Sequence, residues 1–173
     1  MVASPVLPDV LAPGLAVVFC GTAPGTMSAA KGHYYAHPQN KFWRALYTVG
    51  LTPRLLAPSE YRALLDYRIG LTDLAKHTYG MDSQLPAGSL GADATAALRK
   101  RIAQYAPAIL AFTSLNGGRR FLGSKTGFGE QSEKIGATRI WVLPSPSPAA
   151  HWNWKEEIWR DLAGEVGKLR SAA

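Results

Sequence analysis

The chain has 173 residues, of which 47% are hydrophobic and 18% charged, and its formal net charge at pH 7 is +7. These values are typical of a globular domain with a sizeable core, and no apolar run is long enough to cross a membrane. The single cysteine, Cys20, excludes an internal disulfide, a cysteine-ligated iron–sulfur cluster and a cysteine-rich zinc site. The positive charge favours an anionic partner, with nucleic acid the first choice. The N-terminus shows no secretory signal, so we expect a cytoplasmic protein.

The predicted elements alternate between strand and helix. Residues 1–14 contain three prolines and are expected to be an extended lead-in. Short apolar runs predict strands at residues 16–20, 69–74, 108–113 and 139–143. Helical spacing and capping residues predict helices at residues 40–49, 57–67, 93–105, 116–122 and 153–169. Residues 76–91 are predicted to be a loop, and residues 123–136 a glycine-rich loop or hairpin.

This alternation predicts a parallel sheet covered by helices on both faces. We expect an α/β fold, a three-layer αβα sandwich with a central, mostly parallel four-stranded sheet, formed as one domain by residues 15–173. Two strands end in proline-containing loops, GTAPG at residues 21–25 and PSPSP at residues 144–148. The carboxyl ends of parallel strands lie at one edge of the sheet, so the functional cleft is expected between these loops.

Several segments, in chain order, resemble motifs of the uracil-DNA glycosylase superfamily: GTAPGTMSA, YYAHPQNKFW, LLDYRIGLTDL and RIWVLPSPSPAAH. The similarity is greatest to the mismatch-specific uracil and thymine branch, whose motifs are GINPG, AHPANRFW, LLDYRCGVTKL and IWVLPNPSG. It runs nearly collinearly from Leu11 to His151. YYAHPQN and the aspartate of GLTDL also resemble the hypoxanthine-DNA glycosylase branch. Several motifs in register are more specific than any one of them alone.

The resemblance implies a monofunctional DNA glycosylase. Such an enzyme hydrolyses the N-glycosidic bond of uracil, and of other deaminated bases, and leaves an abasic site in base excision repair. It flips the target nucleotide out of the duplex into a pocket. No residue cluster requires a metal or a cofactor. The implied partner is DNA containing uracil or another deaminated base, and we expect a monomer.

The base pocket implied by the resemblance involves Gly21, Thr22, Ala23 and Tyr35. Tyr35 matches an aromatic residue that stacks on the flipped base; the alternative is that it only packs the loop, the role we assign to Tyr34. Thr22 is expected to contribute through its backbone amide. Gly21 is expected to allow close approach of the backbone.

Ala23 departs from the family pattern, in which an asparagine or aspartate holds the attacking water. Alanine has no atom for this purpose. Asn40 is the expected substitute, although a helix cap explains it equally well. Asp73 is a second candidate, as water activator or base-edge acceptor, with a helix cap or salt bridge as the alternative. The alternative function that follows from Ala23 is a uracil- or lesion-binding protein with little or no turnover.

The second proline-rich loop matches the family loop that pinches the DNA backbone. Ser145 is expected near the leaving base, where its hydroxyl would donate to developing negative charge, and Ser147 is expected to contact phosphate. Ala149 and the alanine that follows it are too small to wedge into the duplex, which leaves His151 or Trp152; burial at the start of the last helix is the alternative for Trp152. The expected DNA contacts of this loop are Pro146, Pro148, Ala149, His151 and Trp152.

Overall fold

A five-stranded sheet forms the centre of the protein in the computed structural model, which describes residues 4–172. The strand order is β2-β1-β3-β5-β4. The parallel strands are β1 (Val17–Gly21), β2 (Ile69–Asp73), β3 (Ile109–Phe112) and β5 (Thr138–Val142). The fifth strand, β4 (Gly129–Ile135), pairs antiparallel with β5 at one edge.

The predicted number of four strands is therefore wrong, because β4 forms within the segment expected to be a glycine-rich loop or hairpin. The sequence of β4 is GEQSEKI, and only its last residue, Ile135, is buried. An edge strand exposed along most of its length has no need for the apolar run that identifies a buried parallel strand.

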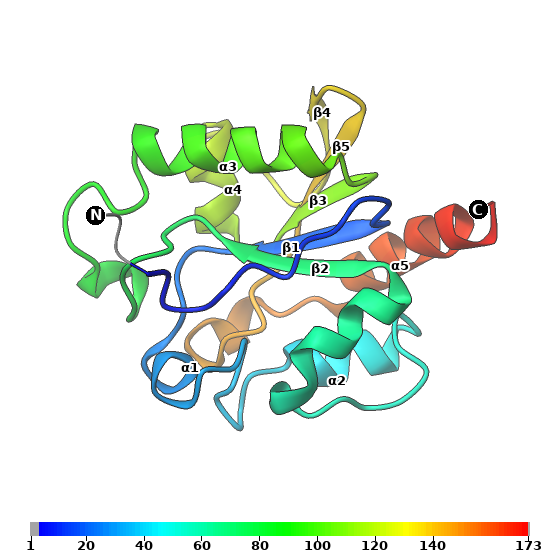
Figure 1. Cartoon of the computed structure of the whole chain (residues 1–173), viewed down its shortest axis with the longest axis horizontal. Helices are drawn as coiled ribbons and strands as arrows, with labels where there is room; N and C mark the ends of the chain where they lie inside the picture. Colours follow the sequence, from blue (N-terminus) through cyan, green and yellow to red (C-terminus); the bar gives the residue numbers. More distant parts are fainter. Residues whose placement is uncertain (1–3, 173) are drawn as a thin grey trace.

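The helices form two layers, one on each face of the sheet (Figure 1). One layer contains α3 (Ala92–Tyr105) and α4 (Leu115–Leu122). The other contains α1 (Thr26–Lys31), α2 (Phe42–Thr48), the 3₁₀ helix η1 (Pro58–Tyr67) and α5 (Glu156–Ser171). Two further 3₁₀ turns are η2 (Asp82–Gln84) and η3 (Pro148–Asn153). The predicted three-layer αβα sandwich is confirmed.

Each face of the sheet has its own apolar core, because successive strand residues point to opposite faces. In β1, Val17 and Phe19 belong to the core shared with α2 and α5. Val18 and Cys20 belong to the core shared with α3 and α4. Burial raises the pKa of the Cys20 thiol far above its usual range, so this residue packs as a small apolar group and is no nucleophile.

Two helical predictions differ from the structure in type or continuity, and one short helix was not predicted. Residues 57–67 were expected to be an ordinary helix but form η1, which is a 3₁₀ helix. Residues 153–169 were expected to be one helix, but the chain makes η3, then an extended step at Trp154 and Lys155, and only then α5. The short helix α1 had no predicted counterpart. Short 3₁₀ pieces lack the sustained apolar periodicity on which sequence prediction depends.

The described part of the lead-in, residues 4–14, packs against the outer edge of β2. Val10 forms an antiparallel bridge with Leu71, and the amide of Val6 donates to the carbonyl of Lys76 (2.7 Å). Leu7 and Val10 are buried. The lead-in therefore covers a sheet edge that would otherwise be open.

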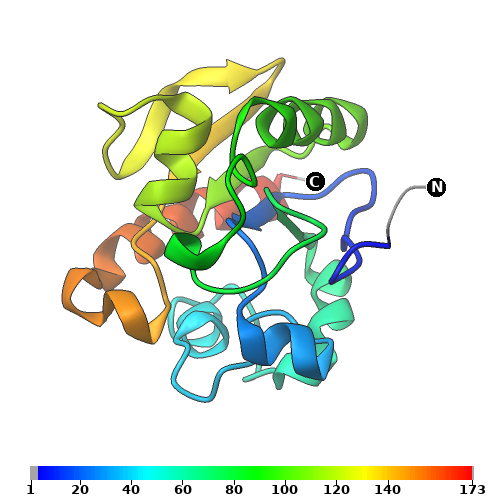
Figure 2. The same ribbon diagram turned by 90° about the vertical axis from the view of Figure 1, so that its left-hand side faces the viewer.

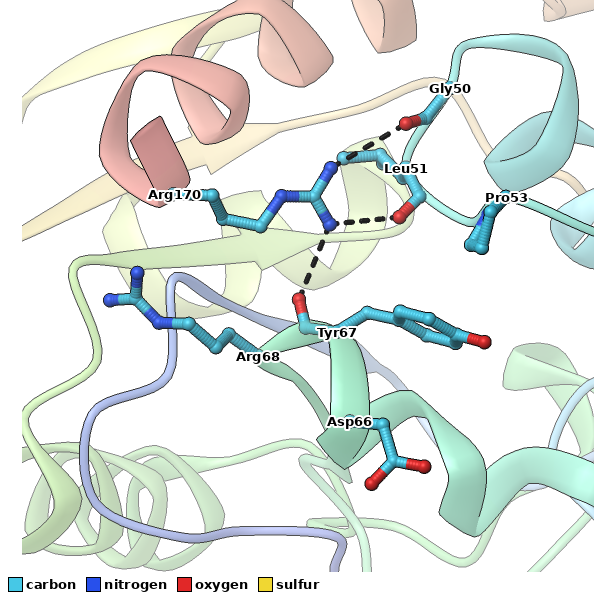
Figure 3. Close-up of a pocket in the computed structure, with 7 residues that line it drawn as sticks. All are labelled: Gly50, Leu51, Pro53, Asp66, Tyr67, Arg68 and Arg170. Carbon is cyan, nitrogen blue, oxygen red and sulfur yellow. Dashed lines mark hydrogen bonds between the residues drawn. The ribbon is translucent and has the colours of Figure 1, made fainter. Parts of the chain in front are cut away.

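At the amino-terminal end of β2, Arg170 ties α5 to the chain just after α2 and to the end of η1, which belong to the same layer. Its guanidinium donates to the carbonyls of Leu51 (2.9 Å) and Tyr67 (3.3 Å) and lines a cavity of about 370 Å³ (Figure 3). The cavity adjoins Arg68, the residue just before β2, so it lies at the opposite end of the strands from the proline-containing loops.

Candidate active site

The carboxyl ends of the four parallel strands face the viewer in Figure 2. The loops that follow β1, β2 and β5, and the start of α4 after β3, all lie at this edge. This arrangement brings together the segments singled out from the sequence, including GTAPG and PSPSP. It is the usual position of ligand sites in open α/β sheets.

Tyr35 lies across this edge and is fixed by several contacts. Its ring stacks on Phe42, with centroids 3.9 Å apart and 18° between the planes. Its hydroxyl lies 3.0 Å from the Thr113 hydroxyl, which itself donates to the carbonyl of Cys20 (3.3 Å). The Tyr35 hydroxyl is therefore the donor to Thr113. Its backbone φ of 51° is uncommon for a residue other than glycine, and the stacking and hydrogen bond offset that cost.

Gly21 and Asp73 are register partners at the ends of β1 and β2. A Cβ atom on Gly21 would lie 2.6 Å from Asp73 Oδ1 and 3.4 Å from the Tyr35 hydroxyl. Any larger residue at position 21 would therefore displace the carboxyl group. The absence of a side chain at Gly21 allows Asp73 and Tyr35 to approach one another.

The Asp73 carboxyl group is buried, with 3% of the residue exposed, and its Oδ2 has no hydrogen-bond partner among residues 4–172. Neither the helix cap nor the salt bridge considered from the sequence is found for it in this part of the chain. The nearby cations are Lys76, which pairs with Asp9 (2.7 Å), and Arg101, which donates to the Asp73 backbone carbonyl (3.1 Å).

Burial is the main reason that the pKa of Asp73 is raised to about 6. The charge of Asp9 raises it further, while Lys76 and Arg101 lower it. Burial, followed by the negative charge of Asp73, raises the pKa of Tyr35 well above its usual range, so Tyr35 stays a neutral donor. An unpaired carboxyl that titrates near neutral pH is a common feature of functional sites.

Asn40 is close to the second proline-rich loop, because the amide of Lys41 donates to the carbonyl of Pro146 (2.9 Å). The Asn40 side-chain oxygen accepts from the amide of Phe42 (2.9 Å), so the capping role considered from the sequence is present. An amide oxygen has two lone pairs, and the cap uses one of them. The cap therefore fixes the side chain without excluding a second contact.

The loop after β5 is held by its own short polar contacts. Ser145 Oγ accepts from the amide of Ser147 (3.2 Å), and Ser147 Oγ accepts from the amide of Ala149 (3.3 Å) at the start of η3. The indole of Trp159 donates to the carbonyl of Pro144 (3.0 Å) and anchors the loop to the core. Both serine oxygens accept hydrogen bonds, and each hydroxyl still has a hydrogen that can donate.

Trp152 lies in η3 and is 77% exposed, so the alternative of burial at the start of the last helix is wrong. His151 is also exposed, with its Nδ1 3.1 Å from the carbonyl of Pro148. Trp154, in the extended step before α5, and Trp159, in α5, by contrast pack against the core.

Sequence reasoning missed a clasp centred on Asp82 in the loop between β2 and α3. Asp82 accepts from the Thr22 hydroxyl (2.5 Å) and from the Asn116 side-chain amide (2.7 Å). The amide of Gly80 also donates to the carbonyl of Pro24 (2.9 Å). Figure 2 shows this loop crossing in front of the carboxyl ends of the parallel strands. Thr113 was missed as well, and neither residue stands in a motif that marks it.

Ala23 is half-buried and packs against the apolar core on the α3 and α4 side. It offers no polar side-chain atom at the site.

Within residues 4–172, no group of three or more His, Cys, Asp or Glu side chains is placed to bind a metal ion. The described helices are also too short or too polar to span a bilayer.

Comparison with known proteins places this chain and its fold in one class. The profile of the uracil DNA glycosylase superfamily matches residues 8–163, and the chain belongs to this superfamily. The fold is also similar to the solution NMR structure of a candidate uracil DNA glycosylase from Methanosarcina acetivorans, with a TM-score of 0.59 and 22% identity. That match covers 90% of this chain and 96% of the other. Superfamily membership supports a DNA glycosylase activity in DNA repair, with DNA as the substrate.

Proposed function

We propose that this protein is a monofunctional DNA glycosylase that removes uracil and other deaminated bases in base excision repair. The observation that carries the proposal is the buried, unpaired carboxyl group of Asp73, next to Gly21 and Tyr35 at the carboxyl edge of the sheet. A buried polar group without a partner is costly, and a ligand that supplies the partner recovers that cost.

The chemistry of deaminated bases suits this carboxyl group. Deamination replaces an amino group by a carbonyl and leaves a protonated ring nitrogen beside it: N3–H with O4 in uracil, N1–H with O6 in hypoxanthine. A neutral carboxyl group donates to such a carbonyl and accepts from the adjacent N–H, whereas a carboxylate only accepts. The raised pKa of Asp73, about 6, makes the neutral form accessible close to neutral pH. We therefore assign Asp73 to recognition of the base edge.

In the proposed mechanism the other residues each supply a distinct contact. The Tyr35 ring stacks on the flipped base, on the face opposite the one that packs on Phe42. Asn40 positions the attacking water, and Ser145 donates to the base as negative charge develops on it. The backbone around Thr22 completes the floor of the pocket. The bond breaks through an oxocarbenium-like state, so catalysis is mainly electrostatic.

On the DNA side, we propose that Trp152 fills the space left by the flipped nucleotide, because it is the most exposed large apolar residue described. Ser147 contacts phosphate, and Pro146 and Pro148 keep the loop rigid. A tryptophan on a short 3₁₀ turn also stacks on unpaired bases, which favours use of single-stranded DNA.

A second candidate function is a lesion-binding protein with little turnover. The observation that favours it is Ala23, which is packed among apolar residues and cannot hold water. A time course with excess oligonucleotide containing uracil or hypoxanthine distinguishes the two functions. The enzyme accumulates alkali-labile sites beyond one per protein molecule, whereas binding without such sites would reject the proposed activity.

Variants of Asp73 separate its two possible roles. Asp73→Asn keeps one donor and one acceptor, so an enzyme that uses Asp73 for the base edge retains its rate within about tenfold, while Asp73→Ala loses about 10- to 100-fold in kcat/KM. If Asp73 instead activates water as a base, Asp73→Asn loses as much activity as Asp73→Ala.

Asn40→Ala is expected to lower the single-turnover rate by about 100-fold or more with little change in binding.

A further inference from the structure

A cavity of about 640 Å³ lies beside the candidate site, between the HPQN segment and the loop that leads into η1. Tyr35 and Asn40 belong to its lining, so it is continuous with the residues assigned to the flipped nucleotide. The site described above does not use the rest of this cavity.

The charged side chains and the histidines that line the cavity are all basic, and the other titratable group in the lining, Tyr35, stays neutral. The basic residues are Lys31, His33, His37 and Arg44, and no aspartate or glutamate is among the lining residues. Lys31 and Arg44 are exposed and form no ion pair with any residue in the described range, 4–172. Several other arginines of the chain are paired, such as Arg139 with Glu130 and Glu165 (both 2.7 Å). The cavity therefore has a local excess of positive charge and favours an anionic ligand.

The remaining lining is apolar. Trp43, Pro38 and Pro58 contribute to it, and Leu55 is 51% exposed beside them. A small inorganic anion would leave this surface bare. A ligand with both a phosphate and a flat apolar part covers it, and a nucleotide of single-stranded DNA has both parts.

We infer that this cavity binds the nucleotide adjacent to the flipped one, with its phosphate on Lys31 and Arg44 and its base or sugar on the apolar floor. The inference rests on the proposed function, because the neighbouring nucleotide belongs to the strand whose target base stacks on Tyr35. The cavity is then a second subsite, which binds the DNA strand on one side of the lesion.

The test is binding of fluorescein-labelled single-stranded oligonucleotides that carry a tetrahydrofuran abasic-site analogue, followed by anisotropy across a salt series. The variant is Lys31→Ala/Arg44→Ala. The matched control is Lys100→Ala/Lys134→Ala, which removes the same charge from exposed positions on α3 and β4. Melting temperatures verify that both variants are folded.

We expect the cavity variant to bind about tenfold more weakly, and its slope of log K against log salt to fall by about 1.4, the value for two lost single-strand phosphate contacts. The control should bind within about twofold of the wild type. Equal weakening of both variants, or an unchanged salt slope in the cavity variant, would overturn the inference.

A second measurement tests the position of the subsite. In two further oligonucleotides the analogue stands at the 5′ end or at the 3′ end, so each lacks one neighbouring nucleotide. The wild type should bind one of them more weakly than the other, and the cavity variant should bind both equally. Equal binding of both by the wild type would contradict the inference. Because these measurements need no turnover, they remain decisive if no base is released and the proposed function fails.

Discussion

Asp73 combines properties that seldom occur together in a folded protein. Its carboxyl group is buried, one oxygen has no partner among the described residues, and its register partner is a glycine that leaves room for it. Two cations lie nearby, but both Lys76 and Arg101 pair with Asp9, and Arg101 donates to the backbone carbonyl of Asp73. The protein thus maintains an unsatisfied acid at the point where ligands bind α/β sheets, a cost that a functional role explains.

This arrangement predicts how stability depends on pH. The pKa of Asp73 is raised in the folded protein to about 6, above its ordinary value of 3.8. Between these two values the folded state binds more protons than the unfolded state, so the free energy of unfolding falls as pH rises through this range. Asp73→Asn removes this dependence. Relative to wild type, we expect the variant to gain roughly 2 kcal/mol between pH 4 and pH 7.

Urea unfolding of both proteins at several pH values measures this difference. The control is Asp93→Asn, because Asp93 is exposed in the first turn of α3. A difference between wild type and Asp73→Asn that stays constant with pH would contradict the raised pKa.

At the scale of elements, the loop between β2 and α3 is fastened across the site. Asp82 joins it to Thr22 in the first motif and to Asn116 in α4. Those partners stand 60 and 34 positions away in the chain. No local pattern signals such contacts, so the sequence predicts a loop at residues 76–91 and indicates no role for it.

Elements with a strong local signal were predictable, and those with a weak one were not. The buried parallel strands are short apolar runs, and α3 and α4 were located to within one residue at each end. The edge strand β4, the 3₁₀ turns and α1 depend on pairing or packing with distant segments. In the candidate site, the residues of the four motifs could be named from the sequence, while the contacts of Thr113 and Asp82 required the fold.

Removal of the Asp82 carboxyl group should loosen this loop. In Asp82→Ala we expect faster hydrogen exchange across residues 76–91, a KM for lesion DNA raised about tenfold and a kcat changed by less than about threefold. The hydrogen bonds are exposed, so the cost in global stability should be about 1 kcal/mol. The neighbouring Ser83→Ala serves as the control. A lower kcat with unchanged KM and exchange would contradict a positioning role.

At the scale of the whole molecule, the carboxyl ends and the amino-terminal ends of the parallel strands carry different features. The carboxyl end carries the unpaired acid, the clasp and the exposed Trp152. The amino-terminal end is closed by Arg170, which holds α5 against the loops around Leu51 and Tyr67 (Figure 3). The contacts that hold α5 and the proposed active site therefore lie at opposite ends of the sheet.

Arg170→Met tests this separation. Loss of charged hydrogen bonds to backbone carbonyls should lower the free energy of unfolding by about 1 to 2 kcal/mol, with glycosylase activity unchanged at a temperature where the variant is folded. Lys168→Met provides the comparison, because Lys168 lies two residues before Arg170 on α5 and its side chain is exposed. Equal destabilisation by both variants, or loss of activity in folded Arg170→Met, would refute it.

The two borders of the sheet bear on how the protein behaves when many copies gather on damaged DNA. One border, β2, is covered by the lead-in through Val10. The other, β4, is exposed but carries Glu130, Glu133 and Lys134. Neither offers the bare apolar strand on which a second chain adds by backbone pairing. Crowding on a damaged strand should therefore not join neighbouring molecules through their sheet edges.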